Sequence, residues 1–105
     1  MARTPKIVGP RPIDLTPETV YTVPAGATGV LRHVHVYNGE GSAGAFTLTA
    51  NDDVAGSAIF QDKSVDADSP FDHYCFYPFP TGTNIRASAG NDDLLTLTIG
   101  IDEIT

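Results

Sequence analysis

The sequence predicts an all-β protein with a single antiparallel β-sandwich, of either the jelly-roll or the immunoglobulin-like type. No window shows the 3.6-residue apolar period of an amphipathic helix, whereas several short segments alternate apolar and polar residues. Eight prolines and ten glycines interrupt the chain. About seven short strands, separated by turn residues roughly every dozen positions, are typical of sandwiches. A length of 105 residues fits one domain.

Residues 1–18 are expected to form an extended, proline-rich arm outside the sandwich domain, which then spans residues 19–105. Four of the eight prolines lie in this segment. Proline lacks an amide donor and biases the preceding residue to extended conformations, which excludes a helix or a central strand. The arm is either a disordered terminus or a segment that docks on a neighbouring subunit. Docking would use its basic and apolar residues: Arg3, Lys6, Ile7, Val8, Arg11, Ile13 and Leu15.

Residues 19–38 are predicted to form a β-hairpin, around which the rest of the chain is organised. Two segments rich in β-branched and aromatic residues flank the turn at residues 24–27. Pro24 presets φ for the turn, and Gly26 can adopt a positive φ. The second segment, from Val30 to Asn38, is the longest candidate strand. We expect the downstream strands to pair with it or pack on it.

Two shorter strands are expected after this hairpin. Residues 39–44 form a loop of small residues, after which Phe46, Leu48 and Ala50 alternate with threonines. A short strand is predicted over residues 57–61. Residues 62–70 are interpreted as a polar, acidic connection.

The segment 71–79 is dense in aromatic residues and is predicted to supply the aromatic mass of the core. It should end at a sheet edge, because Pro78 and Pro80 cannot donate to a ladder. A short strand around Ile85, a turn at residues 90–93 and a final strand over residues 95–101 follow. The final strand has the clearest alternation, with leucine or isoleucine at every second position.

The distribution of charge disfavours a nucleic-acid partner. The chain carries a net charge of −7. Residues 1–18 hold three basic side chains against two acidic ones, whereas residues 19–105 hold three against eleven. An acidic body repels phosphate backbones. No membrane partner is expected either, because no stretch approaches about 20 apolar residues. The N-terminus lacks the apolar core of a signal peptide, which indicates synthesis in the cytoplasm.

His33 and His35 stand two residues apart on the long strand and should point to the same face. Zinc sites normally need three or four ligands, so the pair alone does not predict a metal site, and no cofactor is expected. Val34 and Val36 form the better core face. We therefore expect His33, His35 and the following Tyr37 to be surface or interface residues. The acidic triplets at 51–53, 66–68 and 91–93 lack the ligand spacing of a calcium loop and are interpreted as solvated carboxylates.

No sequence pattern indicates catalysis, so the chain is predicted not to be an enzyme. A nucleophile elbow, a glycine-rich phosphate loop and a paired-carboxylate signature are all missing from the sequence. The single cysteine, Cys75, cannot form an internal disulfide. It has no lysine or arginine beside it to stabilise a thiolate, and it is interpreted as a packing residue.

Two segments carry a resemblance to a known class of protein. The turn from Tyr21 to Gly26 leads into a strand that ends in Asn38, and the segment from Asn84 to Ala89 precedes a final strand rich in threonine and leucine. In these features, over about residues 19–101, the chain resembles a recurring small bacteriophage virion structural protein of the β-sandwich type. The resemblance implies a non-enzymatic protein that assembles on the head or tail of a phage particle. The chain departs from that pattern in its aromatic segment 71–79 and in its proline-rich N-terminus.

The resemblance, the acidic sandwich and the arm together predict a capsid decoration (cement) protein located on the virion. The arm and a sheet edge would bind the major capsid protein on the outer surface of the head and stabilise the shell, and the chain would form a homo-oligomer, expected to be a trimer. Arg3, Lys6 and Arg11 would contact acidic shell surface. The alternative is a tail, collar or fibre component that recognises a host-surface polysaccharide through exposed aromatic residues, for which Tyr37, Tyr74 and Tyr77 are the candidates.

Overall fold

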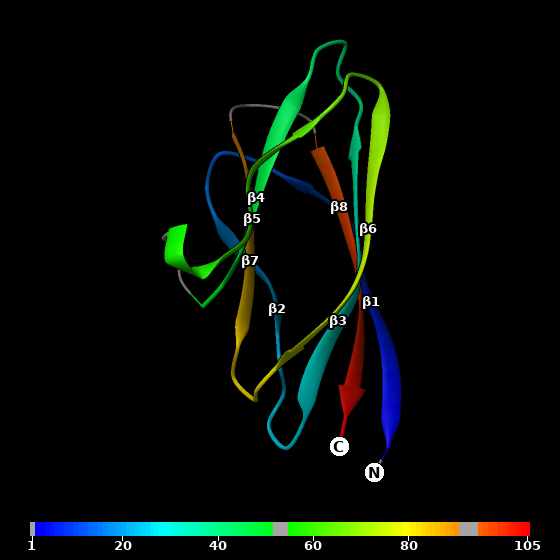
Figure 1. Cartoon of the computed structure of the whole chain (residues 1–105), viewed down its shortest axis with the longest axis vertical. Helices are drawn as coiled ribbons and strands as arrows, with labels where there is room; N and C mark the ends of the chain where they lie inside the picture. The colour runs from blue at the N-terminus through cyan, green and yellow to red at the C-terminus, as the bar shows by residue number, and fades with distance from the viewer. Residues whose placement is uncertain (1, 52–54, 91–94) are drawn as a thin grey trace.

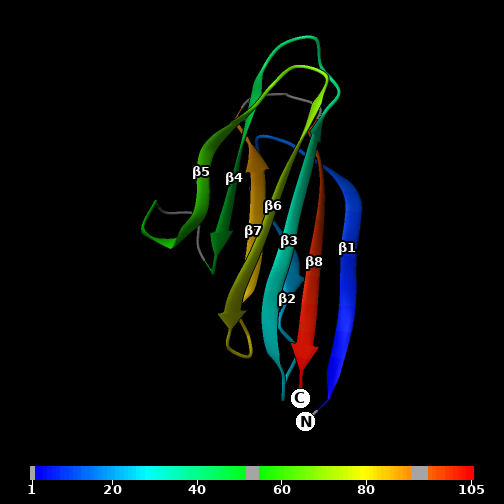
Figure 2. The same ribbon diagram turned by 45° about the vertical axis from the view of Figure 1, so that its right-hand side comes forward.

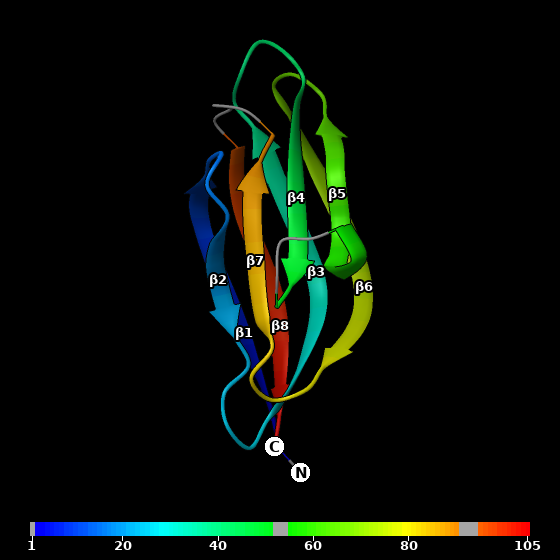
Figure 3. The same ribbon diagram turned by 90° about the vertical axis from the view of Figure 1, so that its left-hand side faces the viewer.

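A computed structural model describes residues 2–51, 55–90 and 95–105 of the chain. It shows two antiparallel four-stranded sheets that pack face to face, which confirms the predicted all-β sandwich (Figures 1 and 3). The elements in chain order are β1 (Arg3–Ile13), β2 (Glu18–Thr22), β3 (Thr28–Asn38), β4 (Gly44–Ala50), the 3-10 turn η1 (Ala55–Ser57), β5 (Ala58–Val65), β6 (Ser69–Phe79), β7 (Asn84–Ala89) and β8 (Leu95–Ile104). Sheet A has the order β1-β8-β3-β6, and sheet B has the order β2-β7-β4-β5. Within the described ranges, no helix has the length and apolar character needed to cross a membrane.

The hydrophobic core lies between the two sheets and follows the period-two alternation of the central strands. In β8 every second side chain from Leu95 to Ile101 is buried, as the sequence predicts. In β4, Phe46 and Leu48 are completely buried and face the core from the opposite sheet. Each fully buried side chain of this size contributes about 1.5–3 kcal/mol relative to an exposed one.

The predicted hairpin over residues 19–38 is wrong, because its two strands lie in different sheets. β2 pairs with β7 in sheet B, whereas β3 lies between β8 and β6 in sheet A. The turn itself is present, since the Ala27 amide donates to the Pro24 carbonyl at 3.2 Å and Gly26 has a φ of 80°. The preceding residue, Val23, exchanges backbone hydrogen bonds with Thr83 and Gly82. A turn signal specifies a change of direction, but it does not specify which strand becomes the hydrogen-bonding partner.

Residues 3–13 do not form the expected separate arm, because they are the edge strand β1 of sheet A (Figure 2). The pairing with β8 runs from Arg3 opposite Ile104 to Ile13 opposite Leu95. Prolines are tolerated here because one side of an edge strand needs no hydrogen-bond donors. The register shifts between Val8 and Arg11, where residues 9 and 10 interrupt the ladder.

The segment between β5 and β6 is shorter than predicted. β5 continues to Val65 and β6 begins at Ser69, so the polar connection covers residues 66–68 rather than 62–70. Strand β6 lies at the edge of sheet A, in agreement with the edge position predicted from its prolines. The predicted turns at 51–53 and 90–93 fall largely outside the described residues.

The aromatic segment 71–79 does not supply the centre of the core. Tyr74 and Phe76 are 76% and 64% exposed. Phe71 and Phe79 are partly buried and pack against the core from its margin. The strand alternates between two faces, so an aromatic-rich edge strand places part of its aromatic residues in solvent.

The two ends of the described chain lie side by side at one end of an elongated molecule of about 45 × 24 × 18 Å (Figure 1). Ala2 and Thr105 exchange two backbone hydrogen bonds, of 2.8 and 2.9 Å. The pairing of β1 with β8 thus continues to the last residue of the chain.

Candidate functional site

The outer face of sheet A, the side turned away from sheet B, carries the candidate site. The strand register aligns Ile7, Gly100, His33 and Tyr74 in one row across β1, β8, β3 and β6. Their neighbours along the central strands, such as Val34, are buried in the core. Alternation therefore places this row on the outer surface.

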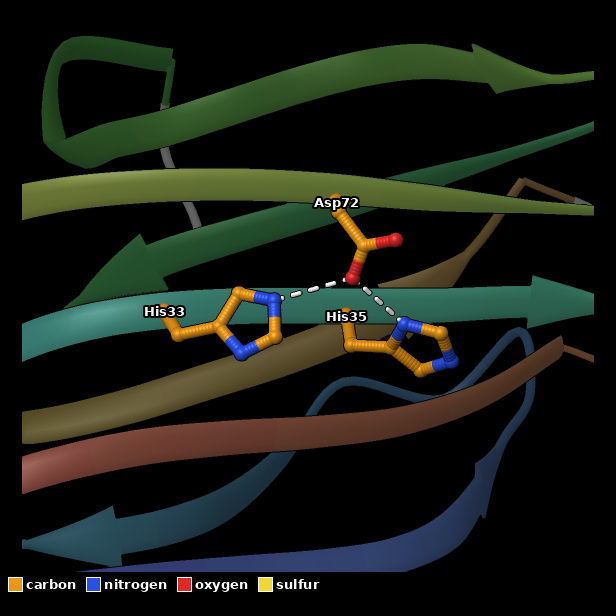
Figure 4. Close-up of side chains that lie close together, drawn as sticks. All are labelled: His33, His35 and Asp72. Atoms are coloured by element: carbon orange, nitrogen blue, oxygen red, sulfur yellow. Dashed lines mark hydrogen bonds and ion pairs between the residues drawn. The ribbon is translucent and has the colours of Figure 1, made fainter.

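His33 of this row and His35, two residues further along β3, share one carboxylate oxygen (Figure 4). His33 Nε2 lies 2.9 Å from Asp72 Oδ1, and His35 Nδ1 lies 2.7 Å from the same atom. His35 on β3 is directly opposite Asp72 on β6 in the ladder. Hydrogen bonds from His35 and, to a lesser extent, from His33 hold the pKa of the Asp72 carboxyl below its usual value. The three side chains are 31%, 35% and 40% exposed, so the cluster is open to solvent.

Apolar and aromatic side chains surround this cluster on the same face. The Tyr74 ring stacks on the His33 ring, with the centroids 4.3 Å apart and the planes 3° from parallel. Four of the six large hydrophobic side chains that are exposed in the described residues lie on this face. We name the set Ile7, Tyr37, Tyr74 and Phe76 the apolar patch.

A second charged cluster occupies the end of the outer face near the chain termini. Arg3 Nε and Arg32 Nη1 lie 2.9 and 3.0 Å from the same oxygen, Asp102 Oδ2. The guanidinium carbon of Arg32 also lies 5.6 Å from the centroid of the Phe76 ring. The Asp102 side chain is only 7% exposed, so the two arginines compensate a carboxylate that has lost most of its hydration.

Both of these carboxylates, Asp72 and Asp102, are thus paired with basic groups, although the chain carries a net charge of −7. A surface with aromatic side chains, arginine and few unpaired charges has the composition of the centre of a protein–protein interface. The outer face of sheet A is therefore chemically suited to binding another macromolecule.

The apolar residues expected to dock on a neighbour do not share one position. Ile7 is 77% exposed on the outer face, and Leu15 is 51% exposed in the connection between β1 and β2. Ile13 is 6% exposed and belongs to the core of this chain, and Val8 packs against that core. The last two side chains are therefore occupied within the molecule, because residues 3–13 form a strand of the sandwich.

The basic residues of the same segment are also separated. Arg3 binds Asp102, and Arg11 Nη2 lies 2.6 Å from Glu18 Oε2. Lys6 is exposed on β1. The seven residues predicted as a docking set therefore do not form a single site.

His33, His35 and Tyr37 lie on the outer face, where the alternation of the long strand places them. Asp72 was missed, because its position opposite His35 depends on the pairing of β3 with β6, and the two residues are 37 positions apart. The interpretation of segment 71–79 as aromatic core material is wrong for Tyr74 and Phe76, whereas the alternative function already required Tyr74 to be exposed. The alternation of Asp72 with Phe71 and His73 was the available signal that one side of this segment faces solvent.

Cys75 takes no part in this site. Its thiol lies on the inner side of β6, 3.4 Å from the Leu31 carbonyl, and burial raises its pKa. A thiol with a raised pKa is a poor nucleophile, which fits a packing residue.

Neither a scan against models of protein families nor a search of curated proteins finds a match to this chain.

Proposed function

We propose that this chain is a bacteriophage capsid decoration protein that binds the outer surface of the head through the outer face of sheet A. The observation that carries the proposal is the apolar patch, whose side chains are between 43% and 77% exposed on one face. The resemblance to small virion proteins supplies the class of partner, the major capsid protein. The same resemblance supports a location on the virion and a non-enzymatic role.

The strand orders support a jelly roll as the sandwich type. In sheet A the first strand pairs with the last, and the orders 1-8-3-6 and 2-7-4-5 are those expected of eight strands in two Greek keys. An immunoglobulin-like sandwich of seven or nine strands would divide them differently. Jelly rolls occur in viral capsid domains and in lectins, so the proposed type is compatible with both candidate functions.

Binding through this face would use groups that are already held in position. Stacking on His33 restricts the Tyr74 ring, and Asp102 holds the Arg32 guanidinium near Phe76. Pre-ordered aromatic and arginine side chains lose little conformational entropy when a partner covers them. Repetition over a symmetric shell would then convert a modest contact into high avidity, most of all for a homotrimer.

In this proposal the outer face of sheet A makes the contact with the capsid that the sequence assigned to a free arm and a sheet edge. β1 and β6 are the edges of sheet A, and both contain prolines that cannot donate to an added strand. Of the residues predicted for the arm, Ile7 contributes most directly to the proposed surface. Lys6, which is exposed on β1, remains a candidate for a peripheral contact, whereas Leu15 lies in the connection between β1 and β2, away from this face.

The proposal is tested by adding purified chain to capsids that lack it and measuring the bound copies. The double variant Tyr74→Ala/Phe76→Ala is expected to bind at least about tenfold more weakly, because truncating central aromatic residues typically costs about 2 kcal/mol each. Leu15→Ala, which removes an exposed leucine away from this face, is the matched control and should bind normally. Full occupancy by the double variant would refute docking through this face.

A polysaccharide-binding tail, collar or fibre component is the second candidate, and the exposure of Tyr74 favours it. An exposed, oriented aromatic ring can stack on the face of a sugar, and Tyr37 and Tyr77, 43% and 39% exposed, are the further tyrosines. Electron cryo-microscopy of the intact particle separates the two candidates by showing density on the shell or on the tail. Glycan binding that is lost in Tyr74→Ala, combined with tail density, would establish the second function.

A further inference from the structure

The cluster on the outer face of sheet A has the composition of a metal site. Imidazole nitrogens and carboxylate oxygens are ligands of zinc, and open zinc sites combine three protein ligands with a water molecule. The two histidines alone fall short of this number. Asp72 adds the third donor from the neighbouring strand, so that one ligand atom from each residue lies within 4.8 Å of the other two.

We propose that His33, His35 and Asp72 bind one Zn²⁺ ion, through His33 Nε2, His35 Nδ1 and a carboxylate oxygen of Asp72. This site is independent of the proposed docking function, because it rests on the three side chains alone.

The backbone already holds the three ligands at a suitable separation. His33 and His35 are on β3, an inner strand of sheet A, and Asp72 is directly opposite His35 on β6. Tetrahedral zinc with bonds of about 2.0–2.1 Å requires its donor atoms to be roughly 3.3 Å apart. The present distances of 2.7 and 2.9 Å to Asp72 Oδ1 are shorter than this, so small side-chain rotations open the space for an ion. Ligands on paired strands are placed more precisely than ligands on loops.

Zinc would replace the two hydrogen bonds that the rings now make to Asp72. When a neutral ring binds zinc through the nitrogen that now faces Asp72, its proton moves to its other nitrogen, which is Nδ1 in His33 and Nε2 in His35. Neither neutral ring therefore has to release a proton to solvent. The stacked Tyr74 ring limits rotation of His33 and favours one orientation of its donor. Partial exposure of all three side chains gives the ion access and leaves a position for water.

The nature of the ligands also defines the expected selectivity. Two nitrogen donors favour Zn²⁺ over Mg²⁺ and Ca²⁺, which prefer oxygen ligands. Isothermal titration of the full chain, after treatment with a chelator and its removal, should therefore detect one Zn²⁺ per chain. Millimolar Mg²⁺ or Ca²⁺ should not compete.

Ligand variants locate the bound ion. His35→Gln and Asp72→Asn should each weaken Zn²⁺ binding by at least about tenfold. Even the loss of a group that only hydrogen-bonds to a metal ligand lowers the metal affinity by about tenfold or more. His73→Gln is the matched control, because His73 is the third histidine of the chain but lies on the other side of β6, against Phe60. It should retain the affinity of the unmodified chain.

The ring resonances of the unmodified chain give a second measurement that does not depend on folding of a variant. On addition of Zn²⁺, the nuclear magnetic resonance signals of His33 and His35 should shift together and saturate at one equivalent, whereas the His73 signal should stay in place. Absence of saturable binding, equal binding by the ligand variants, or shifts confined to His73 would each overturn the proposal. A ratio of one ion to two chains would also overturn it, because the site would then be shared between copies.

Discussion

At the scale of single residues, Tyr21 connects the two sheets at the end of the sandwich near the chain termini. Its hydroxyl on β2 donates to Glu103 Oε2 on β8 at 2.5 Å. Burial, followed by the hydrogen bond and the negative charge of Glu103, raises the pKa of Tyr21 well above its ordinary value. The folded chain therefore retains this proton more strongly than the unfolded chain.

This difference predicts a specific dependence of stability on pH. The contribution of Tyr21 is complete below pH 10, the ordinary pKa of tyrosine. It is lost as the pH rises toward the folded-state pKa, because the unfolded chain releases the proton first. Tyr21→Phe should lower the free energy of unfolding by about 1 kcal/mol near neutral pH and should reduce its decline above pH 10. Urea unfolding between neutral and alkaline pH measures both effects.

Tyr37→Phe is the matched control for this variant, because Tyr37 is 43% exposed on the outer face. It should keep the alkaline profile of the unmodified chain. If Tyr21→Phe lost stability above pH 10 as steeply as the unmodified chain, the decline would have to come from other groups.

Individual side-chain directions could be predicted from the sequence where the alternation was regular. His33 and His35 face outward because Val34 and Val36 face the core. Ile13 could not be placed in the same way, because the prolines around it indicate an extended segment but do not reveal that the segment joins a sheet. The location of Asp72 beside the histidines was beyond prediction, since it requires the pairing of two strands that are distant in the sequence.

At the scale of elements, Gly9 marks the irregularity at which β1 bends along β8. It has a φ of +100°, and a Cβ atom at this position would overlap the backbone oxygen of Leu97. Gly9→Ala should therefore destabilise the chain by about 1–3 kcal/mol through backbone strain, with a further cost from the overlap. Thermal unfolding compares this variant with Gly41→Ala, whose Cβ would meet no atom within 4 Å. Equal melting temperatures for the two variants would show that β1 does not need this conformation.

The assignment of residues 3–13 to a strand also predicts the effect of a deletion. Removing residues 2–13 exposes the edge of β8 and removes Ile13 from the core. Loss of one buried isoleucine costs about 2–5 kcal/mol, and a bare central strand promotes aggregation. The truncated chain should lose cooperative unfolding and elute as aggregates in size-exclusion chromatography. A monomer with an unchanged melting temperature would instead restore the view of a separate arm.

Strands could be predicted well where one face is buried, and their partners could not. The alternation of β4 and β8 identified both elements, because each lies within a sheet and contacts the core from one side. The connection between β2 and β3 contains a genuine turn, yet the two strands belong to different sheets. Local turn chemistry is the same for a hairpin and for a crossing between layers, so only the complete fold distinguishes them.

At the scale of the whole molecule, sheet A combines the first strand with the last and so brings distant parts of the chain together. The residues of the outer face come from β1, β3, β6 and β8. For this reason no contiguous sequence motif predicts the face. Two arginines from different strands meet Asp102, and two histidines meet Asp72. The proposed docking surface and the proposed zinc site are therefore both products of strand order rather than of local sequence.

The backbone contact between Ala2 and Thr105 has a consequence for the connectivity of the fold. Because the two residues are already hydrogen-bonded neighbours, a short peptide linker could join them without disturbing β1 or β8. New termini could then open at Gly41, an exposed position in the loop between β3 and β4. The resulting circular permutant would keep all eight strands and both sheets, with its ends moved to the opposite pole of the sandwich.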